Sequence, residues 1–222
     1  MISSDYKHYK IKTSYANYYV AILKYQDKIY IGSKKKCLII SVYLDGDAPN
    51  IDSVCYDIGC NETATHLMRA GISFVKKHYS KYLKKHKIKL IYIMDKSSIQ
   101  CERNYKQSLP YYYLAKYGQT WYEKHFKAIP DEIKTYEADK KRLKEALATK
   151  PKLKLKNKKL KKLYNNHENI GDFIKDITTT YDCIALKGWF NTFMVSYVPY
   201  LVGMRWKAFM KGNTIDIEIE KD

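Results

Sequence analysis

Arginine is scarce in this 222-residue chain, and its scarcity limits what the strong positive charge indicates. Only four of the 41 basic residues are arginines, and the formal net charge is +18 at pH 7. The forked guanidinium of arginine is favoured for direct readout of phosphate and guanine, whereas lysine acts as a point charge. A/T-rich codons also encode lysine, isoleucine, asparagine and tyrosine. The charge therefore indicates a polyanionic partner, and genome composition explains it equally well.

The cysteines and histidines lack the spacing of a zinc site. The five cysteines are an odd number without a CxxC pair, and the six histidines are scattered. Structural zinc sites place thiolate and imidazole ligands at short, defined spacings. We therefore expect no metal. We also expect reduced thiols, in a cytosolic or nuclear setting, rather than a disulfide scaffold.

Long, purely apolar runs are absent as well. Residues 6–12 are polar and basic where a signal peptide would be apolar. The longest apolar stretch, residues 189–206, is interrupted by Asn191, Pro199 and Arg205, so it indicates core elements rather than a membrane span. We expect no membrane span and an intracellular location, in the cytoplasm or the nucleus.

The chain is rich in apolar and aromatic side chains, which make up 45% and 14% of it. That content is typical of a folded globule rather than a disordered chain. The length suffices for one large domain or for a domain with an appendage.

The first quarter of the chain has the pattern of β-strands. Its segments are rich in β-branched and aromatic residues and are separated by turn signals. One run is continuous enough to predict a strand buried on both faces. The predicted strands are residues 18–25, 28–32, 37–44 and 51–58, with a tight hairpin turn at Gln26-Asp27 and a second turn at 45–50.

A helix, a strand and a second helix are predicted next. Apolar residues at helical spacing predict a helix over residues 61–86, with Asn61 as a candidate N-cap. The nearly continuous apolar run at 88–94 predicts a buried strand. Residues 109–125 are predicted to be helical, with a C-cap at Gly118.

Composition divides the chain into three parts. Residues 1–129 are predicted to form an α/β core, 130–166 a charged helical insertion or linker, and 167–222 a part that completes the core. Residues 214–220 alternate isoleucine with polar or acidic residues, which predicts an exposed or edge strand. The expected fold class is α/β (α+β), with a mixed, largely antiparallel central sheet flanked by helices.

The order strand, strand, strand, helix, strand, helix over residues 18–126 resembles the core of the GCN5-related N-acetyltransferases. In that family a turn of the form Arg/Gln-x-x-Gly-x-Gly/Ala sets backbone amides against the pyrophosphate of acyl-CoA. The nearest match is Arg69-Ala70-Gly71-Ile72-Ser73, which is one residue short and has Ser73 where glycine or alanine is usual. The resemblance implies acetyl-CoA as the ligand, bound through the charge of Arg69 and the amides of Gly71, Ile72 and Ser73.

This hypothesis requires a helix that starts at Gly71. The alternative is that Gly71 is a tolerated glycine in an unbroken helix, in which case no phosphate cradle exists. Under the acetyltransferase hypothesis Tyr122 acts as general acid or Glu123 as general base. The alternative there is a wedge of aromatic core at Trp121-Tyr122-Glu123, with Glu123 in solvent.

A second function, without catalysis, follows from the lysine-rich run at residues 150–162. The run is either a solvated linker or helix face, or an electrostatic arm that binds DNA, RNA or another polyanion. The lysines of this run are Lys150, Lys152, Lys154, Lys156, Lys158, Lys159, Lys161 and Lys162.

The segment Thr120-Trp121-Tyr122-Glu123, preceded by Asp95-x-Ser97, resembles segments of uncharacterised proteins of nucleocytoplasmic large DNA viruses. The bias towards lysine, isoleucine, tyrosine and asparagine is similar to that of A/T-rich members such as the mimivirus relatives. This resemblance implies an intracellular, virion-associated protein and no defined chemistry.

Overall fold

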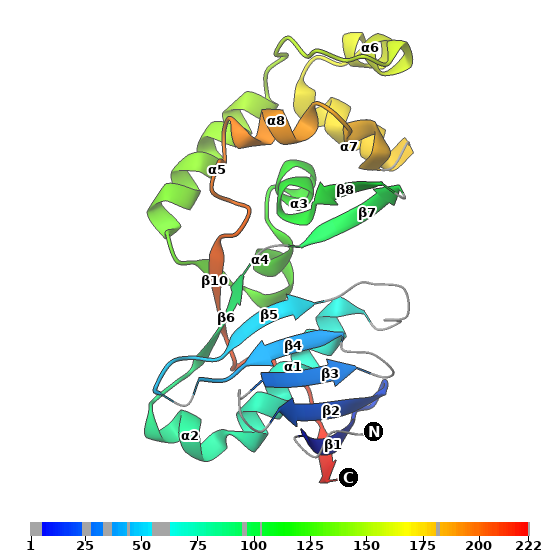
Figure 1. Ribbon diagram of the computed structural model, residues 1–222. Coiled ribbons are helices and arrows are strands. Elements are labelled where there is room, and N and C mark those ends of the chain that lie inside the picture. The colour runs from blue at the N-terminus through cyan, green and yellow to red at the C-terminus, as the bar shows by residue number, and fades with distance from the viewer. Residues whose placement is uncertain are drawn as a thin grey trace. The chain divides into compact units, whose positions relative to one another are not determined.

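The computed structural model of the protein divides into two compact units (Figure 1). We call them the sheet unit (Met1–Met94, His125–Ala128 and Arg205–Asp222) and the helical unit (Asp95–Lys124 and Ile129–Met204). The units do not coincide with the three parts predicted from composition. Within them the structure describes residues 6–23, 28–32, 37–43, 45–54, 63–94, 97–102, 104–180 and 183–221.

The sheet unit is built on a mixed, largely antiparallel sheet, which confirms the predicted fold class. Its strands are ordered β11-β1-β2-β3-β4-β5-β6-β10, and all neighbours are antiparallel except β5 and β6. The strands are β1 (Tyr6–Lys12), β2 (Asn17–Leu23), β3 (Lys28–Gly32), β4 (Leu38–Ser41), β5 (Asn50–Val54), β6 (Leu90–Met94), β10 (Arg205–Phe209) and β11 (Glu218–Lys221).

These strands form because alternate residues are apolar. In β2, Tyr18, Val20 and Ile22 are buried, while Asn17 and Tyr19, which alternate with them, are exposed. Successive side chains of a strand point to opposite faces, so this alternation places one face in the core. The four predicted strands are present as β2, β3, β4 and β5, and the predicted edge strand lies at the sheet edge as β11. The predicted turn at Gln26-Asp27 and the predicted cap Asn61 lie outside the described residues.

Two helices, α1 (Ala64–His78) and α2 (Ser80–Lys85), connect β5 to its parallel neighbour β6. Figure 1 shows α1 behind β3 and β4, across one face of the sheet. Its buried side includes Leu67, Phe74 and Val75. The predicted helix over residues 61–86 is therefore confirmed as a pair of helices.

The helical unit packs its helices around aromatic side chains. Phe173 and Phe190 are completely buried, and the ring of Tyr164 lies 4.9 Å from that of Phe173. Gly118 has a left-handed conformation (φ 70°) and donates from its amide to Leu114 O at 2.9 Å, which confirms the predicted C-cap. The elements are β7 (Ser98–Glu102), β8 (Tyr105–Ser108), α3 (Leu109–Tyr117), α4 (Trp121–Phe126, which continues into the sheet unit), β9 (Ile129–Pro130), α5 (Ile133–Leu147), α6 (Lys158–Asn165), α7 (Ile170–Thr180), the 3-10 helix η1 (Cys183–Leu186) and α8 (Phe190–Val195).

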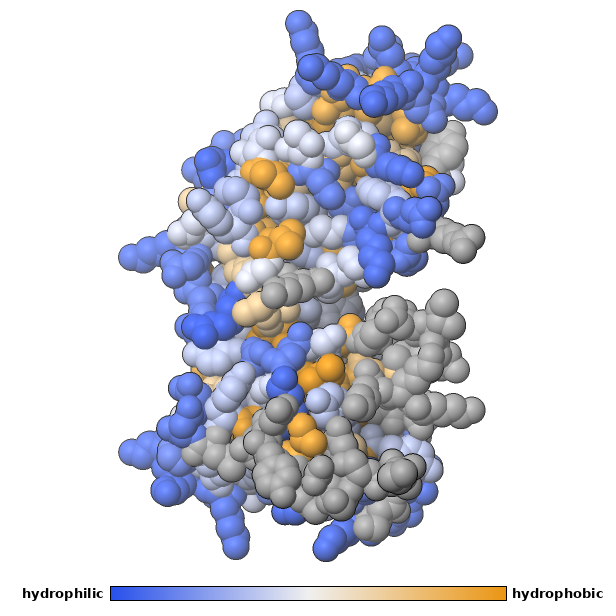
Figure 2. Space-filling view, viewed as in Figure 1, coloured by the Kyte–Doolittle hydropathy of each residue, from blue (hydrophilic) through white to orange (hydrophobic). Residues whose placement is uncertain are grey.

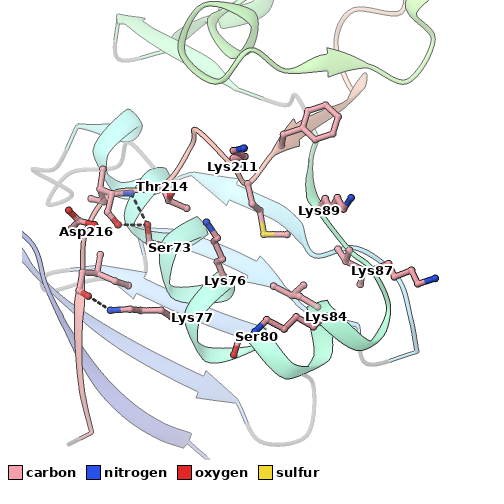
Figure 3. A pocket seen from close by; sticks show the side chains of 16 residues that line it. Ser73, Lys76, Lys77, Ser80, Lys84, Lys87, Lys89, Lys211, Thr214 and Asp216 are labelled. Carbon is pink, nitrogen blue, oxygen red and sulfur yellow. Dashed lines mark hydrogen bonds between the residues drawn. The ribbon is translucent and has the colours of Figure 1, made fainter.

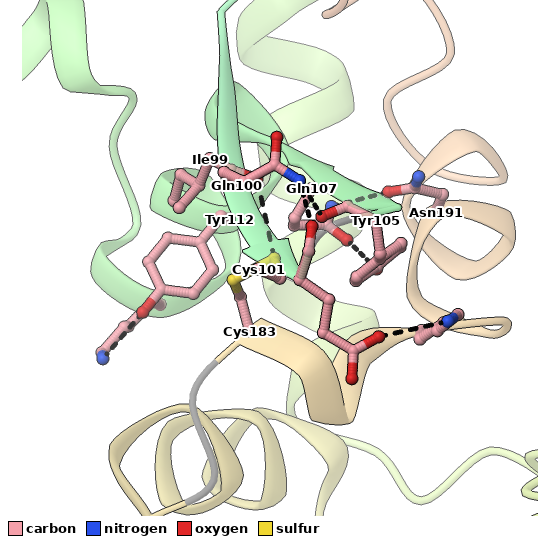
Figure 4. Close-up of a disulfide and its surroundings, with 11 residues drawn as sticks. Ile99, Gln100, Cys101, Tyr105, Gln107, Tyr112, Cys183 and Asn191 are labelled. Carbon is pink, nitrogen blue, oxygen red and sulfur yellow. Dashed lines mark hydrogen bonds and ion pairs between the residues drawn. A yellow bond between two sulfur atoms is a disulfide. The ribbon is translucent and has the colours of Figure 1, made fainter. Parts of the chain in front are cut away.

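A disulfide between Cys101 and Cys183 joins β7 to η1 (Figure 4). Beside it, the fully buried Gln107 donates to Asn191 Oδ1 and accepts from the hydroxyl of Tyr105, both at 2.6 Å. Cys37 in the sheet unit is disulfide-bonded as well. The expectation of reduced thiols is therefore wrong. Spacing along the sequence did not reveal the bond because its cysteines are 82 residues apart.

None of the described helices combines the length and the apolar character that a membrane crossing needs.

Candidate anion-binding sites

The amides of the expected pyrophosphate site lie inside α1. This helix runs without a break from Ala64 to His78, and Gly71 and Ile72 are buried in it. Beyond the first turn of an α-helix, each amide donates to the carbonyl four residues earlier and is not available to a phosphate. The expectation that a helix starts at Gly71 is therefore wrong.

Gly71 instead allows α1 to approach the sheet closely. A Cβ atom at this position would lie 2.4 Å from Leu38 Cδ2 and 2.9 Å from Ile40 Cδ1, both far inside van der Waals contact. Glycine is the residue that permits such a close approach. The physical reason for the glycine is packing against β4, not recognition of a phosphate.

Arg69 and Ser73, the other two residues of the expected site, hold segments of the sheet unit together. Arg69 donates from Nη2 to His125 O at 3.2 Å. Ser73 Oγ donates to Ile215 O and accepts from Ile215 N, both at 2.8 Å. Binding of acetyl-CoA stays a prediction, and these residues do not form the cradle that it requires.

The expected general base, Glu123, caps helix α4. Its Oε2 accepts from the amide of Thr120 at 2.6 Å, and Thr120 Oγ1 accepts from the amide of Glu123 at 3.3 Å. This reciprocal pair is a capping box, and the Thr-x-x-Glu spacing was visible in the sequence. Glu123 also accepts from the hydroxyl of Tyr136 at 2.5 Å and pairs with Lys140 Nζ at 2.8 Å.

The contacts of Glu123 and its neighbour favour a structural interpretation. The side chain of Glu123 is 17% exposed, so it is not in solvent as the alternative reading expected. Tyr122 is 4% exposed, and its ring packs edge-on against Trp121 at 5.2 Å. The structure therefore favours an aromatic core over the expected pair of proton-transfer groups.

The predicted basic arm has a defined backbone conformation within the helical unit. Residues 151–157 form neither helix nor strand, and burial alternates from one residue to the next over residues 151–156. Leu153 and Leu155 are half-buried, while Lys152, Lys154 and Lys156 are exposed. An extended chain produces this alternation because successive side chains point to opposite sides.

Helix α6 continues the arm and holds it in place. Asn157 caps the helix by accepting from the amides of Lys159 (2.9 Å) and Leu160 (3.3 Å). The buried Tyr164 donates from its hydroxyl to Pro151 O at 2.5 Å, which ties the helix to the start of the extended stretch. Leu160, Leu163 and Tyr164 face inward at helical spacing, and the four lysines of the helix (Lys158, Lys159, Lys161 and Lys162) are exposed.

All eight predicted lysines are exposed, and we call seven of them the lysine array: Lys152, Lys154, Lys156, Lys158, Lys159, Lys161 and Lys162. Within the described part of the chain, no acidic side chain pairs with them. Lys150 differs, because its Nζ donates to Asn165 O at 2.9 Å and lies over the ring of Tyr164. Figure 2 shows hydrophilic side chains over α6 with hydrophobic residues beneath them.

A second basic feature, which sequence reasoning missed, is a hollow of about 1290 Å³ in the sheet unit (Figure 3). Its walls come from α1 and α2, from residues 87–89, and from residues 209–217. Ser73 and Lys77 fasten the last of these walls to α1, since Lys77 Nζ donates to Ile217 O at 2.5 Å. Of the four residues expected to bind the pyrophosphate, only Ser73 lines this hollow.

The hollow has a cationic rim and an apolar floor. Leu83, Met210 and Ile217 on the floor are 6%, 4% and 6% exposed. Among the described residues that line the hollow, Asp216 is the single acid. The lysines that line it are Lys76, Lys77, Lys84, Lys87, Lys89 and Lys211.

Lys87 reaches the rim through an unusual backbone conformation. It has a φ of 56° at the end of α2, where its amide donates to Lys84 O (3.2 Å) and the amide of Ile88 donates to Leu83 O (2.9 Å). These two bonds form a Schellman motif, whose left-handed position normally holds glycine. A side chain there carries a steric cost that glycine avoids.

Comparison with known proteins assigns no family, because no family model, no curated protein and no solved structure matches this chain. The strand order specific to acetyltransferases is accordingly not confirmed, and the resemblance to viral proteins stays a prediction. Among the described residues, no three histidine, cysteine or acidic side chains come together as metal ligands. The lysine array and the hollow are the two features of the described residues that indicate a function.

Proposed function

We propose that the protein binds DNA or RNA through the phosphate backbone, without reading the base sequence, and that binding rather than catalysis is its activity. The observation that carries the proposal is the lysine array, which is exposed, free of acidic partners in the described residues, and accompanied by half-buried leucines and the buried Tyr164, whose hydroxyl donates to Pro151 O.

The geometry of the array fits a linear polyanion. Alternate residues of an extended chain are about 7 Å apart, so Lys152, Lys154 and Lys156 form an evenly spaced row on one side. Because the hydrogen bond from Tyr164 to Pro151 O already ties the extended stretch to α6, binding would order little more than the lysine side chains. Contacts to phosphate position a protein on nucleic acid but carry no sequence information. Lysine, as a point charge, suits such contacts.

The first turn of α6 supports the same conclusion. Lys158 and Lys159 occupy it, and it contains no acidic residue. A helix dipole is positive at this end, so the two cations there oppose helix formation. A phosphate bound at this end would interact favourably with both the lysines and the dipole.

Salt dependence of oligonucleotide binding tests the proposal. We expect anisotropy titrations with a labelled single-stranded oligonucleotide to give a plot of log K against log salt that falls steeply. The slope should reach at most about −5, the value for seven phosphate contacts on a single strand. Lys152→Gln/Lys154→Gln/Lys156→Gln should make the slope shallower by about 2, because three contacts are lost.

Helix α5 supplies a matched control in the same unit. Lys134→Gln/Lys141→Gln/Lys144→Gln removes the same charge from exposed positions of a helix that also carries Glu137, Asp139 and Glu145. We expect its slope to match that of the unaltered protein. A flat salt response, or equal losses in the two triple variants, would contradict the proposal.

A further inference from the structure

We propose that the hollow of the sheet unit binds a small amphiphile in which a phosphate monoester is joined to an apolar chain. This inference is independent of nucleic-acid binding, since the hollow and the lysine array belong to different units and share no residue.

The lysines of the rim favour a ligand with an anionic group. Five lysines of the rim (Lys76, Lys84, Lys87, Lys89 and Lys211) pair with no acidic side chain among the described residues. Cations gathered around a concave surface raise the local concentration of anions. Figure 3 shows that these side chains come from the helices, from the segment between α2 and β6 and from the C-terminal wall, so they surround the hollow.

The apolar floor favours an apolar group on the same ligand. Buried Leu83, Met210 and Ile217 form it together with the half-buried Ile88 and Ile215. A purely polar anion would leave this surface in water, and a purely apolar ligand would leave the ammonium groups without partners. A volume of about 1290 Å³ leaves room for a chain beside the phosphate, because pockets that bind drug-sized ligands measure roughly 300–1,000 Å³.

Lys87 provides a second, independent observation. A left-handed residue that ends a helix is usually glycine, and a lysine there is less favourable for the backbone. The lysine adds a cation to the rim of the hollow at this cost. Residues in strained conformations concentrate at functional sites.

Calorimetry with alkyl phosphates, kept below the concentration at which they form micelles, tests the proposal. We expect decyl phosphate to bind with one saturable site per chain. Affinity should rise by about fourfold for each further methylene that the floor covers, as measured along the series from butyl to decyl phosphate. Inorganic phosphate has the anionic group without the apolar chain, and a decyl glycoside has the chain without the anionic group. Each should therefore bind much more weakly than decyl phosphate.

Two double substitutions of lysines in α1 and α2 distinguish binding in the hollow from attraction to positive charge in general. Lys76→Gln/Lys84→Gln removes two rim cations and should weaken decyl phosphate about tenfold. Lys81→Gln/Lys85→Gln removes two exposed cations of α2 outside the hollow and should leave affinity unchanged within about twofold. Lys87→Gly should weaken binding about threefold without lowering the unfolding midpoint, so a folding defect cannot explain the loss.

Four results would overturn the proposal. They are absence of saturable binding, equal affinity for inorganic and decyl phosphate, equal losses in the two double variants, and displacement of decyl phosphate by an equivalent concentration of oligonucleotide phosphate. The last would make the hollow part of a general polyanion surface. Neutralising Lys152, Lys154 and Lys156 should leave decyl phosphate binding intact, so failure here is distinguishable from failure of the nucleic-acid proposal.

Discussion

At the scale of single residues, Gly71 shows that a glycine in a motif typical of ligand binding can be required for packing instead. Gly71→Ala should lower the free energy of unfolding by up to about 2 kcal/mol. The new methyl group would press on Leu38 and Ile40, which are completely buried, and overpacking typically costs about 1–3 kcal/mol. Higher helix propensity offsets about 1 kcal/mol of that. Urea unfolding monitored by circular dichroism measures the difference.

A second substitution tests the cause of that loss. Leu38→Val shortens the side chain that the new methyl group would meet first. In a double-mutant cycle, Gly71→Ala should therefore cost less in the Leu38→Val background than in the unaltered protein. If Gly71→Ala instead raises stability, helix propensity dominates and the packing argument for this glycine fails.

At the scale of elements, the two lysines in the first turn of helix α6 lower the stability of that helix. Lys158→Glu/Lys159→Glu puts acids at the positive end of the helix dipole. We expect the free energy of unfolding to rise by about 1 kcal/mol at low salt, since each favourable charge at a helix end contributes about 0.3–1 kcal/mol. The same variant should weaken oligonucleotide binding. Chemical denaturation and anisotropy measure the two effects.

The other end of α6 supplies the control for this charge reversal. Lys161→Glu/Lys162→Glu changes the net charge by the same amount but places acids towards the negative end of the dipole. It should weaken oligonucleotide binding to a similar extent and lower stability instead of raising it. Equal stability changes in the two variants would show that net charge, rather than the dipole, controls α6.

Sequence predicted most elements because each depends on a local signal. Alternation in β2, helical spacing in α1 and the glycine at the end of α3 are readable within about ten residues. The hollow was not predictable in this way, because its lysines at 76–89 and Lys211 meet only when the C-terminal wall crosses α1. One local signal did exist: Lys76, Ser80, Lys84 and Lys87 recur at helical spacing beside the apolar stripe.

At the scale of the whole molecule, the path of the chain explains why the predicted domain boundaries differ from the units. The chain leaves the sheet unit after β6, re-enters it at His125–Ala128 and returns to it as β10, whereas residues 95–124 and 129–204 form the helical unit. Its apolar residues, among them Phe173, Phe190 and Met194, resemble a continuation of the first core in composition. They are buried in a core of their own, and composition alone does not distinguish the two cases.

The disulfide of the helical unit gives the last prediction. Cys101→Ser/Cys183→Ser removes a crosslink between residues separated by 82 positions. Its loss should lower the stability of the helical unit by about 4 kcal/mol, because the unfolded chain regains the freedom of a long loop. Hydrogen exchange followed by mass spectrometry should show faster exchange in β7, α3 and α7 and unchanged exchange in α1 and β2. The double substitution is preferable to a reductant because Cys37 is also disulfide-bonded. If exchange accelerates equally in both units, they unfold as one cooperative body and the division described above has no energetic meaning.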